Sequence, residues 1–93
     1  MIRETQPSFR EIEASGQNFS LIEKGARELL TLTPDELIEY SSSHFGPVQR
    51  LIPIKACEKQ LDFYHIIKNT EAEDKFLAAL PILWALYDEC RAH

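Results

Sequence analysis

The side chains best suited to hold a metal ion are two cysteines and three histidines: Cys57, Cys90, His44, His65 and His93. A zinc site needs several such ligands at short, characteristic spacings. Cys90 and His93 are three residues apart, but His93 is the last residue and is expected to be mobile. Cys57 and His65 lie two helical turns apart, which is too far for both to bind one ion without a bend. We therefore expect no metal and no cofactor.

The two thiols are also poorly placed for a disulfide with each other. If the chain forms a helical hairpin that turns at Asn69 and Thr70, Cys57 and Cys90 are separated by about 12 Å along its axis at 1.5 Å per residue. A disulfide requires α-carbons within about 7 Å. Buried, reduced thiols are the expectation, and a Cys90–Cys90 bond between two copies stays compatible with the spacing.

No pattern of catalytic residues is present. The sequence contains no GxSxG, Walker loop, GxGxxG or HExxH. Three glycines are too few to make a phosphate-binding loop easy to build. Neighbouring carboxylates fall at helix ends or on wet faces, where capping and solvation explain them: Glu71 and Glu73, Asp35 and Glu36, Asp88 and Glu89. The sequence therefore predicts that the protein is not an enzyme.

One segment has the layout of a helix-turn-helix. Residues 34–60 read as a helix, a Gly-Pro turn and a second helix. The second helix carries residue types that contact phosphates and bases, namely Gln49, Arg50, Lys55 and Lys59. Against this, Pro53 interrupts the would-be recognition helix, and the basic residues are few. We retain a DNA-binding transcriptional regulator as the alternative function.

Size and charge favour a single, acidic domain. The chain has 93 residues, with ten basic and fifteen acidic side chains and a net charge of −5. A chain this short buries only about 60–65% of its unfolded surface, so a second copy or a partner would help its stability. The charge repels phosphate backbones, which makes nucleic-acid binding unlikely on average. The N-terminus carries no apolar run typical of a signal peptide, and a cytoplasmic location is the default expectation.

The last helix, predicted over residues 70–91, is the element that the others must pack on. Thr70 and Glu73 have capping-box spacing at its start. Its apolar residues cover more than the 100° stripe of an ordinary amphipathic helix. The uncharged run is far shorter than the roughly 20 residues of a membrane span. Pro81 lies inside and predicts a kink or a break.

This helix supplies the candidate interface. Its apolar face has two interpretations, as core and as a surface for a second copy or another protein. The candidate partner or dimer residues are Phe76, Leu80, Leu83, Trp84 and Tyr87. Aromatic residues do not decide between the two because they are common in cores and in interfaces.

Shorter helices are predicted upstream. Residues 1–7 are expected to be a flexible tail, followed by a single helical domain over residues 8–93 that opens with a short helix over about residues 9–14. Helical spacing predicts a helix over about residues 18–32. Thr33, Pro34 and Glu36 predict the start of the next helix, which Gly46 and Pro47 end.

The last two helices are expected to pair. Pro47 and Pro53 open or kink a segment that runs to Asn69, with one apolar stripe of Ile54, Cys57, Leu61 and Tyr64 and a second of Phe63, Ile66 and Ile67. Because the connection at Asn69 and Thr70 is very short, the two helices should form an antiparallel hairpin.

Together these features predict an all-α fold, a compact bundle of four to five helices kinked at Pro53 and Pro81. The expected function is that of a small regulatory or adaptor protein, such as an inhibitor, anti-activator or chaperone. It would act by burying an apolar helical face against another protein or a second copy of itself, with a homodimer expected. Acidic flanks would set orientation and on-rate.

Overall fold

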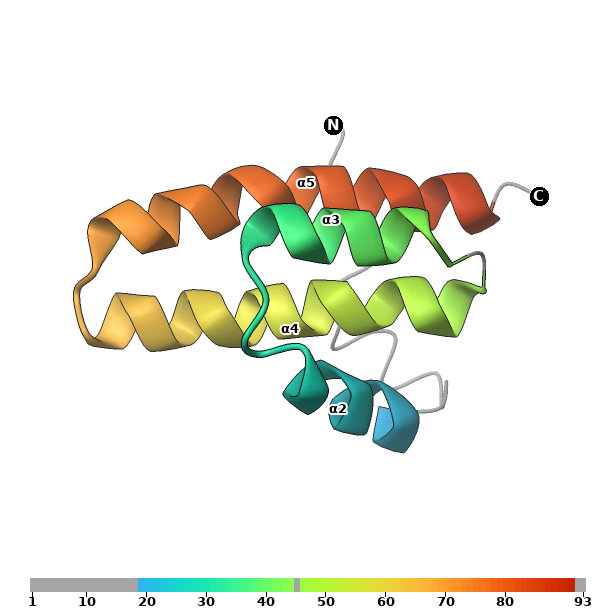
Figure 1. The fold of residues 1–93 in the computed structure, drawn as a ribbon, viewed down its shortest axis with the longest axis horizontal. Coiled ribbons are helices and arrows are strands. Elements are labelled where there is room, and N and C mark those ends of the chain that lie inside the picture. Colours follow the sequence, from blue (N-terminus) through green and yellow to red (C-terminus); the bar gives the residue numbers. More distant parts are fainter. Residues whose placement is uncertain (1–18, 45, 92–93) are drawn as a thin grey trace.

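The computed structural model describes residues 19–44 and 46–91, which form four helices and no strand. Figure 1 shows these helices packed as a small bundle. Their bounds are α2 Phe19–Glu28, α3 Pro34–Ser42, α4 Pro47–Ile66 and α5 Thr70–Arg91. The all-α prediction is therefore confirmed. The predicted tail and the short helix over residues 9–14 lie outside the described residues.

The two longest helices, α4 and α5, form the predicted antiparallel hairpin. They run side by side over most of their length, and α3 packs against both while α2 packs against α4 (Figure 1). Each helix continues through its proline, Pro53 in α4 and Pro81 in α5, so neither proline breaks it. The predicted bends at these prolines stay predictions.

The core forms where the helices face one another. It contains buried residues from every described helix: Ile22, Ala26, Leu37, Leu51, Ile54, Ala56, Cys57, Phe76, Leu83, Trp84 and Tyr87. Leu51, Ile54 and Cys57 of α4 follow one another at steps of three, which places them on one side of that helix. The pairing of α4 with α5 was predictable from sequence because their connection is short.

Helix α3 begins where the sequence predicts, but it ends at Ser42, short of the predicted end at Gly46. The Thr33 hydroxyl accepts a hydrogen bond from the Glu36 N–H at 3.2 Å, and the Thr33 N–H donates to the Glu36 carboxylate at 2.9 Å. Pro34 is the first helical residue, where its missing N–H leaves no bond unmade. Gly46 is the N-cap of α4 and Pro47 its first residue, so the predicted start of this helix is confirmed.

Helix α2 ends four residues earlier than the predicted limit at Leu32. After Glu28 the backbone tightens into bonds that span three residues, from the Leu29 N–H to the Ala26 carbonyl and from the Leu32 N–H to the Leu29 carbonyl. Leu29 and Leu32 still pack against the core from this turn. Apolar spacing alone does not distinguish such a turn from another helical turn, so the predicted end was wrong.

The start of α5 also differs from the prediction. The N-cap is Asn69 and not Thr70, because the Asn69 side-chain oxygen accepts from the Ala72 N–H at 3.2 Å and the Asn69 carbonyl accepts from the Glu73 N–H. Thr70 is already helical. Asn is as good an N-cap as Thr or better, and it directly precedes the predicted residue.

Among the described helices, none combines the length and the apolar character that a bilayer crossing requires.

Candidate functional site

The apolar face predicted as an interface lies mainly in the core of the chain itself. Phe76, Leu83, Trp84 and Tyr87 are all buried, with at most 6% of any of these residues exposed, and Leu80 is partly buried against the same cluster. The Phe76 ring stacks on Tyr64 of α4 with centroids 5.7 Å apart. The face therefore serves the folding of one chain, and little of it is left to contact another.

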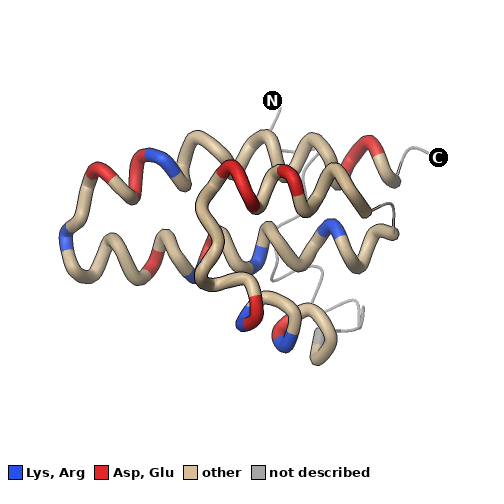
Figure 2. The backbone as a smooth tube through the Cα atoms, in the orientation of Figure 1, with Lys and Arg blue, Asp and Glu red and all other residues tan. Residues whose placement is uncertain are grey.

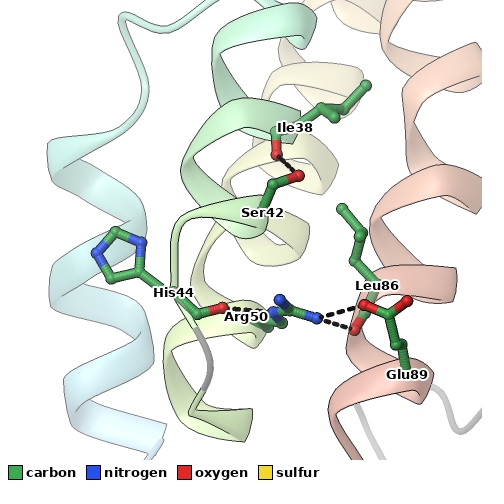
Figure 3. A network of polar contacts seen from close by, with 6 residues as sticks. All are labelled: Ile38, Ser42, His44, Arg50, Leu86 and Glu89. Atoms are coloured by element: carbon green, nitrogen blue, oxygen red, sulfur yellow. Dashed lines mark hydrogen bonds and ion pairs between the residues drawn. The ribbon is translucent and has the colours of Figure 1, made fainter.

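The residues of the DNA-binding alternative do not form a cationic surface. Arg50 is 3% exposed, and its guanidinium donates to the backbone carbonyls of His44 at 2.5 Å and Leu86 at 2.7 Å (Figure 3). The same group lies 3.4 Å from the Glu89 carboxylate. Arg50 thus ties the end of α3 and the last turns of α5 to α4 and does not reach outward.

The two lysines of that alternative are likewise engaged inside the fold. Lys59 lies 3.0 Å and Lys55 3.9 Å from the carboxylate of Glu23 in α2. The hydrogen bond from Lys59 holds the pKa of Glu23 below its ordinary value. Of the four candidate residues, Gln49 is the exposed one. A duplex would therefore meet no basic patch built from this set, and the two lysines are better explained by the packing of α2 on α4.

The surface that is open lies at the end of the α4–α5 hairpin. In Figure 1 the hairpin extends past α2 and α3 on the side of its turn. Three apolar residues in this extension are more than half exposed, namely Phe63 at 53%, Ile66 at 75% and Ile67 at 51%. We call these three residues the tip surface. Leu77 of α5 is a further exposed apolar residue, at 49%.

The tip surface continues a stripe of α4 that α2 covers. Ile52, Ala56 and Gln60 follow one another at steps of four along α4 and face α2. A β-carbon added at Gly25 of α2 would come within 2.8 Å of Ile52, which shows how closely the two helices approach. The Gln60 amide donates to the Leu30 carbonyl just after α2 ends.

Phe63 and Ile67 come next on that stripe, at steps of three and four. The chain has by then left α2 and crosses toward α3 (Figure 1), so no described helix lies over them. The stripe therefore extends along α4 beyond the part that α2 covers. Large uncovered apolar patches on a folded protein commonly mark interaction sites.

The turn beside the tip surface holds a strained residue. Lys68 has a φ of 60°, in the left-handed region. The Lys68 N–H donates to the His65 carbonyl at 3.2 Å and the Asn69 N–H to the Tyr64 carbonyl at 2.9 Å. This pair of bonds is a Schellman motif, in which glycine is the usual left-handed residue. Asn69 therefore both closes α4 and caps α5, which fixes the direction in which the tip projects.

Replacing Lys68 with glycine should raise the free energy of unfolding by about 1 kcal/mol, because glycine adopts the left-handed conformation without a β-carbon clash. Urea unfolding followed by circular dichroism measures the change. Lys68→Ala is the matched control, and it should leave stability nearly unchanged because alanine keeps the strain. If both substitutions changed the free energy of unfolding equally, the change would come from loss of the lysine side chain and not from the backbone conformation.

Cys57 is buried and Cys90 is partly buried. Cys57 and Cys90 do not form a disulfide. Burial raises the pKa of the Cys57 thiol to about 12, and this thiol donates to the Phe76 carbonyl, so it is unreactive near neutral pH. The described part of the chain contains no cluster of three side chains able to hold a metal ion. A shallow hollow of about 480 Å³ between α3 and α5 is lined by Thr33, Pro34, Asp35, Lys75 and Ala78.

No protein family, curated protein or solved structure matches this chain, so its function must be argued from the tip surface.

Proposed function

We propose that this protein is a small regulatory or adaptor protein that acts by binding other protein through the tip surface. The observation that carries the proposal is the exposure of Phe63, Ile66 and Ile67 together at one end of α4, while the preceding part of the same stripe is covered by α2. This keeps the kind of function expected from the sequence and moves the binding face from α5 to the end of α4.

The mechanism is the burial of an apolar helical face. Covering these half-exposed side chains would contribute roughly 1 kcal/mol each, by the usual relation between buried apolar area and free energy. The surface belongs to a rigid hairpin that is already formed, so a partner would not have to order it first. An amphipathic helix laid along α4 beyond α2 is the shape that this surface fits best.

Capture experiments with two variants test the proposal. The purified chain, Ile66→Asp and Leu21→Asp are each immobilised and exposed to lysate of the source cells, with and without nuclease treatment. Leu21 is 59% exposed on α2, away from the tip, and provides a matched control for the same chemical change. Captured proteins are identified by mass spectrometry and then rebuilt into complexes from purified components.

We expect a stoichiometric protein to bind the original chain and Leu21→Asp, and to bind Ile66→Asp about thirtyfold or more weakly, because aspartate would be buried without a partner. Circular dichroism should show all three folded, since both positions are exposed. Equal binding by Ile66→Asp would refute the tip surface as the binding face. Capture that vanishes with nuclease would favour nucleic-acid binding instead.

A further inference from the structure

We propose that the tip surface is occupied by the tip surface of a second copy, with the two α4 ends antiparallel and the two-fold axis at the level of residue 65 along the helix. The inference rests on the proposed function, because it takes the tip surface to be a protein-binding face, and it names the partner. The contact would be isologous, meaning that the same patch serves on both chains.

The uncovered part of the stripe has the shape to bind a helix. Along Ile52, Ala56 and Gln60 the stripe is covered by α2, and the same kind of cover is missing over Phe63 and Ile67. The end of α4 in a second copy is itself a helix with an apolar face of matching length. Each copy would therefore supply to the other the cover that α2 supplies further along α4.

Charge fixes the direction and the register. The tip surface lies in an uncharged stretch, residues 63–67, with Asp62 before it and Lys68 after it. Figure 2 shows the last turn of α4 without Lys, Arg, Asp or Glu, and that turn contains the titratable residue His65. Neither Asp62 nor Lys68 forms an ion pair within the described chain.

In an antiparallel pair centred on residue 65, residue 63 of one copy is level with residue 67 of the other. Lys68 follows the end of α4 at Ile66, so the turn that carries it would lie beside Asp62 of the second copy. This register opposes Asp62 to Lys68 of the second copy at both ends of the contact. It also sets Phe63 against Ile67 of the second copy. A parallel pair in register would instead set like charges together, which is unfavourable.

His65, which lies between Phe63 and Ile67 in the sequence, does not obstruct this contact. His65 is two residues from Phe63 and so lies about 200° around the helix from it. Its Nδ1 lies 3.1 Å from the Glu73 carboxylate of α5 within the same chain. The net charge of −5 on each copy opposes association at long range, but physiological salt screens charges that lie more than about 8 Å apart.

Charge reversal gives a test that depends on the register. Asp62→Lys sets lysine against Lys68 of the second copy, and Lys68→Asp sets aspartate against Asp62. Aspartate tolerates the left-handed conformation at residue 68. Each variant should repel itself, whereas a mixture of the two variants restores both opposite-charge pairs. Sedimentation equilibrium over a wide concentration range measures the association of each sample.

We expect the original chain, of 10.7 kDa, to form a dimer as its concentration rises. Each single variant should dissociate about tenfold or more readily, and the equimolar mixture should recover the original affinity. Ile66→Asp should be a monomer, and Leu21→Asp should associate normally. Circular dichroism confirms that each variant is folded.

Three results would overturn the inference. They are a monomeric original chain at all concentrations, single variants that associate as well as the original, and a mixture that stays monomeric while the original is a dimer. The first and second leave the capture experiment to decide the proposed function separately. If capture of another protein depends on Ile66 while the original chain stays a monomer, the proposed function stands and the second copy is not its partner.

Discussion

Replacing Trp84 with alanine should lower the free energy of unfolding by about 3–5 kcal/mol, the usual cost of removing a buried tryptophan from a core. Only 6% of Trp84 is exposed, and its ring meets Tyr87 edge to face with centroids 5.8 Å apart. A domain of this size has a total stability of about 5–15 kcal/mol, so the loss would be a large part of it. Urea unfolding followed by far-UV circular dichroism measures the change.

Leu77→Ala is the matched control for this substitution. Leu77 lies on the same helix but is 49% exposed, so its truncation should cost less than about 1 kcal/mol. If Trp84→Ala cost no more stability than Leu77→Ala, Trp84 would not be a core residue. If Trp84→Ala kept its stability and lost only the ability to associate, Trp84 would be an interface residue, as the alternative interpretation of the sequence had it.

Replacing Arg50 with alanine should cost about 3 kcal/mol of unfolding free energy, even though arginine is a residue of protein surfaces. Its buried guanidinium joins the His44 and Leu86 carbonyls, and hydrogen bonds that involve a charged group contribute about 1.5–3 kcal/mol. Its aliphatic stem also packs against its neighbours, and alanine removes that contact. The carbonyl groups would be left with fewer partners.

Two further variants separate the parts of this contribution. Arg50→Lys should lose part of the stability, because a single ammonium does not reproduce the planar fork that reaches both carbonyls. Glu89→Ala should cost less than about 1 kcal/mol, because the Glu89 side chain is 66% exposed and its ion pair is weak in water. If Glu89→Ala cost as much as Arg50→Ala, the ion pair and not the carbonyl contacts would hold these helices together.

The elements of this fold were predictable because local signals mark most of their boundaries. The Thr33 capping box and the Gly46–Pro47 boundary work through bonds between residues three or four apart, so they do not depend on the rest of the fold. The end of α2 depends instead on where Leu29 and Leu32 meet the core. That contact is long-range, and a helix and a tight turn satisfy it equally well.

The candidate site was harder to predict because exposure is a property of the packed molecule. The sequence identifies Phe63, Ile66 and Ile67 as a second apolar stripe. It does not reveal that α2 ends too early to cover them. Likewise, Arg50 and Lys59 carry the charge that DNA contacts need, but only the structure reveals that one is buried and that the other pairs with Glu23.

The three-residue connection between α4 and α5 has a consequence for how the molecule folds. Closing so short a loop costs little conformational entropy, and contacts near it along the chain form fast. We therefore expect the hairpin to assemble before α2 docks. During that interval the whole stripe from Ile52 to Ile67 is exposed, so a newly made chain would present a longer apolar surface to other molecules than the folded protein does. Docking of α2 would then reduce aggregation, because it leaves only the tip surface of that stripe exposed.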